Sequence, residues 1–224
     1  MENTKQGSGH YRKIIARSHK YIDIHNPSNW KAKLSDNLVT RTQLKQAKIN
    51  LHSKYIGSDI ADTLTRLKLS KTLFGTQLYK CGLTDHPYCK TCLKELGVEI
   101  PENIIHATFE CSFVAAVVNI VIDTFFPENK STFYIRDILL AITEEKHQLY
   151  TGRVGQHLAS LIWDFFLNYI VKTRNKNGTP IASICVHEIK SQINRVLKIL
   201  PHTEITKYIA KNATLRQIFC ENIL

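Results

Sequence analysis

The sequence contains no long hydrophobic run. Its two most apolar stretches, residues 111–126 and 158–171, are interrupted by polar residues such as Asn119, Asp123 and Asp164. A membrane-spanning helix needs about 18 or more consecutive apolar residues. Residues 1–26 also lack the apolar core of a signal peptide, because charged and polar residues occur throughout them. We therefore expect an intracellular protein, in the nucleus or the cytoplasm, with no membrane as a partner.

Alternating strand patterns and internal repeats are also missing. Apolar residues instead recur every three or four positions, which is the spacing of one face of a helix. With 224 residues, 43% of them hydrophobic, the chain is long enough to bury a core. We predict a mainly α fold with no strand outside a short hairpin. The expected C-terminal helices are residues 111–126, 133–142, 158–171 and 181–200, and one more after Pro201.

Acidic residues are scarce in the first part of the chain. Residues 1–94 hold 17 Lys and Arg against 6 Asp and Glu, a net charge of +11, whereas residues 95–224 hold 13 of each. Such a separation favours a polyanionic partner, RNA or DNA, over an ordinary solvated basic surface.

These observations divide the chain into three predicted parts. Residues 1–36 lack periodicity and contain Gly and Pro breaks, so we predict a flexible basic arm. Residues 37–115 form a basic helical region in which a C-x2-C pair and a later His and Cys indicate a zinc knuckle. Residues 116–224 form a helical bundle tail. We expect loss of the knuckle to leave the bundle folded.

Cysteine and histidine spacing predicts a metal site. Cys89 and Cys92 form a C-x2-C pair, and His106 and Cys111 follow in the pattern C-x2-C-x13-H-x4-C. In a reducing compartment such cysteines favour metal ligation over disulfides. Four side-chain ligands leave no position for water, so a Zn²⁺ ion bound here would be structural. The alternatives are ordinary buried thiols, or His86 in place of one ligand.

His106 and Cys111 are five residues apart, and this spacing constrains the backbone. On a continuous α-helix their side chains would point about 140° apart. We therefore expect the helix that begins near Pro101 to end before Cys111.

Four basic residues precede the knuckle. Arg66, Lys68, Lys71 and Lys80 are the predicted contacts to nucleic acid, because clustered ammonium and guanidinium groups bind phosphates. The alternative is a solvated basic face.

The segment from residue 64 to residue 115 resembles the zinc-binding segment at the C-terminal end of reverse transcriptases from non-LTR (LINE-like) retrotransposons. The helical tail after it is also similar. The sequence departs from the family pattern at Gln77, Lys80 and Leu93, none of which is a proposed ligand. The matching residues are Arg66, Leu67, Gly75, Leu78, Tyr79, Lys80, Gly82, Asp85, Pro87, Cys89, Cys92, His106, Glu110 and Cys111.

The resemblance implies nucleic-acid handling during target-primed reverse transcription, and other parts of such a reverse transcriptase as possible partners. It implies no catalysis by this chain. The sequence has neither the paired aspartates of a polymerase nor the acidic cluster of a nuclease. We expect a non-catalytic, zinc-stabilised nucleic-acid-binding module. The alternative is an interaction or scaffold domain in which the helical tail binds a protein and the zinc is purely structural.

Overall fold

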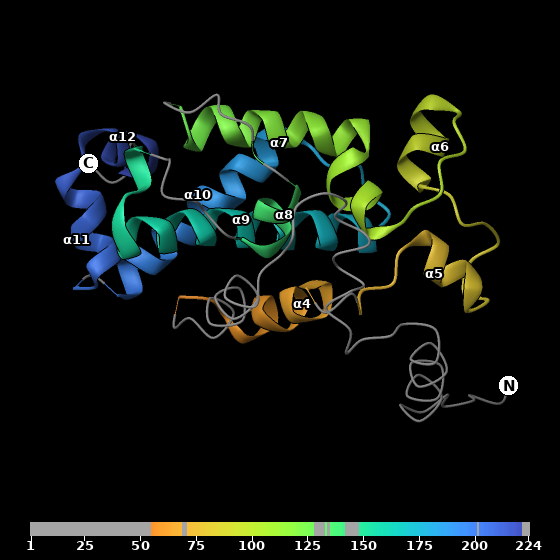
Figure 1. The fold of residues 1–224 in the computed structure, drawn as a ribbon, viewed down its shortest axis with the longest axis horizontal. Helices are drawn as coiled ribbons and strands as arrows, with labels where there is room; N and C mark the ends of the chain where they lie inside the picture. Colours follow the sequence, from red (N-terminus) through yellow and green to blue (C-terminus); the bar gives the residue numbers. More distant parts are fainter. Residues whose placement is uncertain are drawn as a thin grey trace, which may run out of the picture.

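The computed structural model describes residues 55–68, 71–127, 133, 135–141, 148–200 and 202–220. The predicted arm (1–36) and residues 37–54 of the predicted basic helical region lie outside these ranges. Within them the chain is helical, and its sole β feature is an antiparallel bridge between Tyr88 and Pro101. The prediction of a mainly α fold is confirmed (Figure 1). No helix in the described ranges is long and apolar enough to cross a membrane.

The elements are α4 (Ser58–Lys68), α5 (Gly75–Lys80), α6 (Lys90–Leu96), the π-turn η1 (His106–Glu110), α7 (Ser112–Phe125), α8 (Ile135–Leu140), the 3-10 turn η2 (Gln148–Tyr150), α9 (Gly152–Asn175), α10 (Ala182–Ile199), α11 (Glu204–Lys211) and α12 (Ala213–Cys220). The apolar spacing therefore located the bundle helices. After Pro201 the structure has two short helices where one was predicted.

The centre of the fold is α9, which is 24 residues long and therefore spans about 36 Å. It is buried over most of its circumference, because apolar residues cover every side except one narrow polar edge. Helix α10 packs closely against both α7 and α9. Phe126, the residue that follows α7, stacks on Trp163 of α9 with ring centroids 5.3 Å apart.

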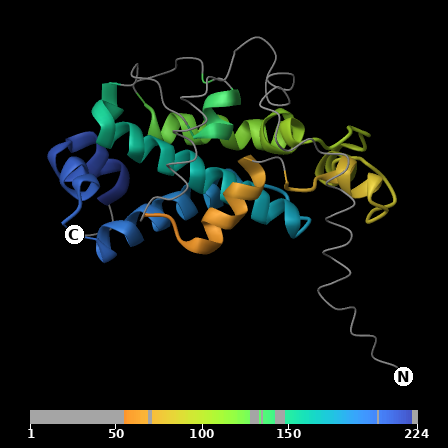
Figure 2. The same ribbon diagram turned by 60° about the horizontal axis from the view of Figure 1, so that its bottom comes forward.

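Helix α4 crosses the polar edge of α9 (Figure 2). Lys68 and Asp164 form a buried ion pair with a distance of 2.6 Å between Nζ and Oδ1, and Lys172 reaches Asp59 at the exposed end of the crossing. Asp164 belongs to the polar edge of α9, yet it is fully buried, because α4 covers that edge and supplies the opposite charge.

The two ends of α9 contact different parts of the chain. Helices α11 and α12 lie at one end and α5 and α6 at the other (Figure 1). The Tyr208 hydroxyl of α11 donates to the Leu149 carbonyl, just before α9 begins. The domain boundary predicted after residue 115 falls inside α7, and residues on both sides of it belong to one hydrophobic core. This boundary therefore does not separate two cores.

Candidate metal centre

Cys89 and Cys92 are held by the start of α6. Cys89 is the N-cap residue, and its Sγ accepts a hydrogen bond from the Cys92 backbone N–H at 3.5 Å. The helix ends at Gly97, whose φ of 67° is a left-handed conformation that glycine adopts without steric cost. The short helix thus turns both sulfur atoms toward the same point.

His106 and Cys111 are brought together by the π-turn η1. The Cys111 N–H donates to the His106 carbonyl at 2.9 Å, an i→i+5 hydrogen bond. This wider turn places residues five apart nearly above one another, which an α-helix does not do. The Asn103 side chain caps the turn by accepting from the His106 N–H. As expected, the helical backbone ends at Cys111, whose ψ is 127°.

The four predicted ligands converge on one buried point. The Sγ atoms of Cys89, Cys92 and Cys111 and a ring nitrogen of His106 all lie within 4.8 Å of one another. Cys92 Sγ is 3.5 Å from His106 Nε2 and 3.6 Å from Cys111 Sγ. These side chains could together hold one metal ion. His86 is not part of the cluster; its Nδ1 accepts a hydrogen bond from the Tyr88 N–H.

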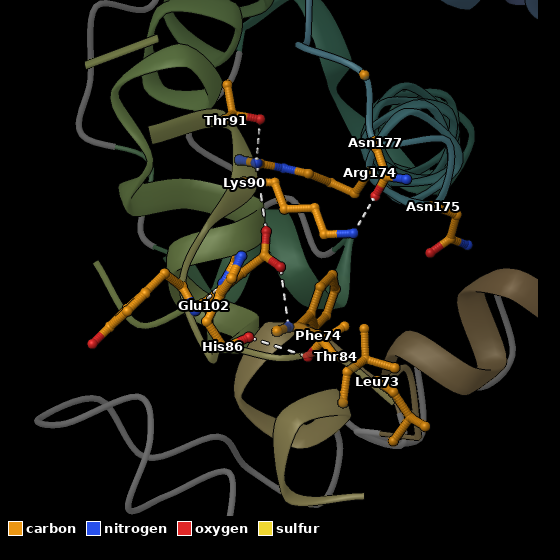
Figure 3. Close-up of a pocket in the computed structure, with 14 residues that line it drawn as sticks. Leu73, Phe74, Thr84, His86, Lys90, Thr91, Glu102, Arg174, Asn175 and Asn177 are labelled. Carbon is orange, nitrogen blue, oxygen red and sulfur yellow. Dashed lines mark hydrogen bonds and ion pairs between the residues drawn. The ribbon is translucent and has the colours of Figure 1, made fainter. Parts of the chain in front are cut away.

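A fifth residue, which the sequence analysis did not identify, contacts the cluster. Arg174, near the end of α9, donates from Nη1 to Cys89 Sγ at 3.1 Å. The same Nη1 donates to the Thr91 hydroxyl at 2.8 Å (Figure 3). Its side chain is only 5% exposed. The residue follows the centre by more than 60 positions in the sequence, so no local spacing pattern indicates it.

Glu102 joins the arginine to the backbone around α5. One carboxylate oxygen lies 3.5 Å from Arg174 Nη1, and the other accepts from the Gly75 N–H at 3.0 Å. Glu102 also donates its N–H to the Pro87 carbonyl. A Cβ at position 75 would lie 2.8 Å from that carbonyl oxygen, so only glycine fits there. The Gly75 and Pro87 of the sequence motif therefore have structural roles beside the centre.

Hydrogen bonds and burial shift the pKa values of the thiols. The hydrogen bond between Cys89 and Cys111 holds the pKa of Cys111 well below its ordinary value, and the Arg174 guanidinium acts in the same direction. The same hydrogen bond, with burial, raises the pKa of Cys89. Burial raises that of Cys92 as well. Without a cation the cluster thus favours a single thiolate, whereas a bound divalent cation deprotonates all of its thiol ligands.

Three of the four predicted phosphate contacts are exposed. Lys71 and Lys80 have no acidic partner within the described ranges, and Arg66 forms only a surface ion pair with Asp62 at 2.8 Å. The prediction that Lys68 contacts phosphate is wrong. Lys68 is 6% exposed, and its ammonium group donates to Asp164 and to the Leu140 carbonyl. Because the Lys68 ammonium forms a buried ion pair, Lys68 cannot bind a phosphate at the surface.

Comparisons with known proteins give no relative: no family model, curated protein or solved structure matches this chain.

Proposed function

We propose that the centre binds one Zn²⁺ ion and that this ion is structural. In tetrahedral zinc sites the Zn–S distance is about 2.3 Å and the Zn–N distance about 2.0 Å, so neighbouring ligand atoms lie about 3.5–3.8 Å apart. The 3.5 and 3.6 Å separations around Cys92 agree with this geometry. Three thiolates and one imidazole complete the coordination shell and leave no position for a reacting water molecule.

We further propose that the chain is a non-catalytic nucleic-acid-binding module, with RNA or DNA as its partner. The observation that carries this proposal is the concentration of the net charge of +11 in residues 1–94, next to a rigid centre. Lys71 and Lys80 present ammonium groups that no acidic side chain of the described ranges neutralises. Arg66 adds a third charge, since an exposed pair such as Arg66–Asp62 is worth at most about 1 kcal/mol and is easily exchanged for phosphate.

Binding measured against salt concentration tests this function. Labelled duplex DNA and a single-stranded oligonucleotide would be titrated with the wild-type chain and with the double variant Lys71→Gln/Lys80→Gln. Each lost phosphate contact should make the plot of log K against log salt shallower by about 0.9 for duplex DNA or about 0.7 for a single strand. The matched control is Lys207→Gln/Lys211→Gln, which removes two exposed charges from α11 at the opposite end of the molecule.

The two outcomes are distinct. Weaker binding and a shallower slope in the first variant alone would support the proposed surface. Equal affinity and slope in all three proteins would contradict it.

The resemblance to non-LTR reverse transcriptases is part of the proposal. The order of residues from Arg66 to Cys111 supports it. On this view the chain derives from such a reverse transcriptase, and other parts of that protein are its possible partners.

A scaffold domain is the second candidate. Helix α10 and the residue before it expose three isoleucines, Ile181, Ile184 and Ile199. Exposed apolar side chains of this size can contact a protein partner. This candidate would be preferred if the chain binds neither DNA nor RNA at low salt.

A further inference from the structure

A cavity lies between the metal-centre segment and the end of α9. It has a volume of about 160 Å³. Binding pockets for whole drug-sized ligands are larger, about 300–1,000 Å³. The cavity therefore suits one planar ring system with a small polar attachment (Figure 3).

The walls of the cavity are suited to a flat aromatic ligand. His86 and Tyr88 both line it and are half-buried, with their rings stacked at a centroid distance of 5.7 Å and an angle of 19°. An incoming base can extend this stack, since every base has a π-face. Leu73, Phe74 and Leu78 supply an apolar surface in the same cavity.

One positive charge lines the cavity and has no acidic partner among the residues that the structure describes. The Lys90 ammonium donates to the Asn177 side-chain oxygen at 2.9 Å, which holds the ammonium in place but leaves its charge uncompensated (Figure 3). The other ionised groups of the lining, Arg174 and Glu102, are paired with each other. The Lys90 ammonium is therefore the cationic group of the lining that a phosphate can bind.

Polar groups in the lining can recognise the edge of a base. Arg174 Nε and Nη2 are buried and have no hydrogen-bond acceptor within the described part of the chain. The carboxamides of Asn175 and Asn177 add donors and acceptors to the lining. These groups distinguish the cavity from a purely apolar packing defect, because they offer hydrogen bonds to the edge of a planar heterocycle.

We propose that this cavity binds one unpaired nucleotide of a single-stranded nucleic acid, with the base stacked on the His86–Tyr88 pair and a flanking phosphate at Lys90. The inference rests on the proposed nucleic-acid-binding function and gives it a specific ligand. A base within a duplex has no free face to add to the stack, so the cavity selects a single strand, an overhang or a flipped base.

Fluorescence of 2-aminopurine tests this inference, since stacking quenches that base. The full chain would be titrated into a short single strand containing one 2-aminopurine, and separately into the matching duplex. We expect quenching with the single strand. Tyr88→Leu should remove the quenching and weaken binding about 5- to 100-fold, as measured for single stacked bases. Tyr88→Phe keeps the ring and should behave as wild type.

Two matched controls separate the cavity from general effects. Tyr79→Leu removes an exposed aromatic ring of α5 outside the cavity lining and should leave quenching unchanged. Lys90→Gln should make the single-strand salt slope shallower by about 0.7, whereas Lys94→Gln, on the same helix and paired with Glu95, should not. Metal content and the circular-dichroism spectrum verify that each variant is folded.

The results discriminate between the two proposals. Binding without quenching, or equal quenching in wild type and Tyr88→Leu, would overturn the cavity proposal and leave the general binding function intact. Absence of any binding at low salt would overturn both.

Discussion

At the scale of single residues, Arg174 lies between two acidic groups, the Cys/His cluster and Glu102. Three thiolates with a divalent ion would carry one net negative charge, and a buried charge of this kind is costly unless a cation lies beside it. The guanidinium lies against Cys89, while Glu102 and Thr91 fix its orientation. A planar, always-charged group suits this position better than lysine would.

Removal of one ligand should abolish stoichiometric metal binding. We expect Cys92→Ser to lower zinc content from one ion per chain to near zero, because a neutral hydroxyl replaces a thiolate ligand. Elemental analysis of the purified protein measures this. The control is Cys81→Ser, since Cys81 is a free, half-buried thiol outside the cluster. A zinc content of one in Cys92→Ser would show that this cluster is not the site.

Removal of the neighbouring charge should weaken the site without removing a ligand. Arg174→Met deletes the donor to Cys89 and leaves Glu102 without its ion pair. Changes to residues that support metal ligands typically lower affinity about 10- to 100-fold, and we expect a loss in that range. Competition with a chromophoric chelator measures it. Lys176→Met, an exposed position two residues away, is the control and should retain wild-type affinity.

At the scale of elements, the polar edge of α9 is a feature that the sequence pattern predicts without indicating which element packs on it. Ser160, Asp164, Asn168 and Lys172 recur every four residues, which predicts one polar stripe but not what covers it. In the structure Lys68 of α4 covers Asp164. The two residues are 96 positions apart, so local spacing could not pair them.

Breaking this buried pair should destabilise the fold. Lys68→Met leaves the Asp164 carboxylate without a counter-charge, and such losses cost about 3–5 kcal/mol. The double variant Lys68→Met/Asp164→Leu should recover most of that loss, because neither charge is then buried. Urea unfolding of the wild type, both single variants and the double variant measures the coupling. If the effects of the two single changes on the free energy of unfolding were additive, Lys68 and Asp164 would not be coupled.

Acidic pH should reduce the loss of folding stability that Lys68→Met causes. Burial already raises the pKa of Asp164 above its ordinary value of 3.8, although Lys68 opposes the shift. Without Lys68 the folded-state pKa should rise further, so protonation favours the folded form. The stability difference from wild type should therefore have its full size above that folded-state pKa and shrink as the pH falls through it. A difference in the free energy of unfolding that is independent of pH between about 4 and 7, the range above the unfolded-state pKa, would argue against a buried carboxylate.

Some elements of the fold and site were predictable because their signals are local. The apolar spacing of α7, α9 and α10 and the four-ligand pattern are both readable within short segments. The π-turn at His106 was not predictable, because it depends on a backbone hydrogen bond. The contact of Arg174 with Cys89 was not predictable either, because it depends on how α9 packs. Lys68 was misassigned for the same reason.

At the scale of the whole molecule, one hydrophobic core joins the metal-centre segment to the bundle. Cys89, Cys92 and Cys111 belong to the same buried cluster as Phe165 of α9 and Phe219 of α12. The sequence had suggested that the bundle would remain folded without the knuckle. The shared core leads us to expect coupled unfolding instead.

Removing the metal should therefore lower the stability of the whole helical fold. An ion that binds only the folded state stabilises it by about 4 kcal/mol when its free concentration is about 1,000 times Kd. Thermal unfolding followed by helical circular dichroism, with and without a strong chelator, measures the effect. We expect a single transition at a lower temperature after chelation. A chelator-independent midpoint would show that the bundle is stable alone.

The position of Arg174 at the far end of a 24-residue helix sets a minimum length for any excised zinc peptide. A peptide covering residues 71–127 would carry all four ligands, yet it would lack the guanidinium that contacts Cys89 and Glu102. A useful truncation must extend past residue 178 to keep this contact and the Asn177 side chain that holds Lys90. Peptide boundaries chosen from the ligand spacing alone would yield a site that binds metal more weakly and has lost one wall of its cavity.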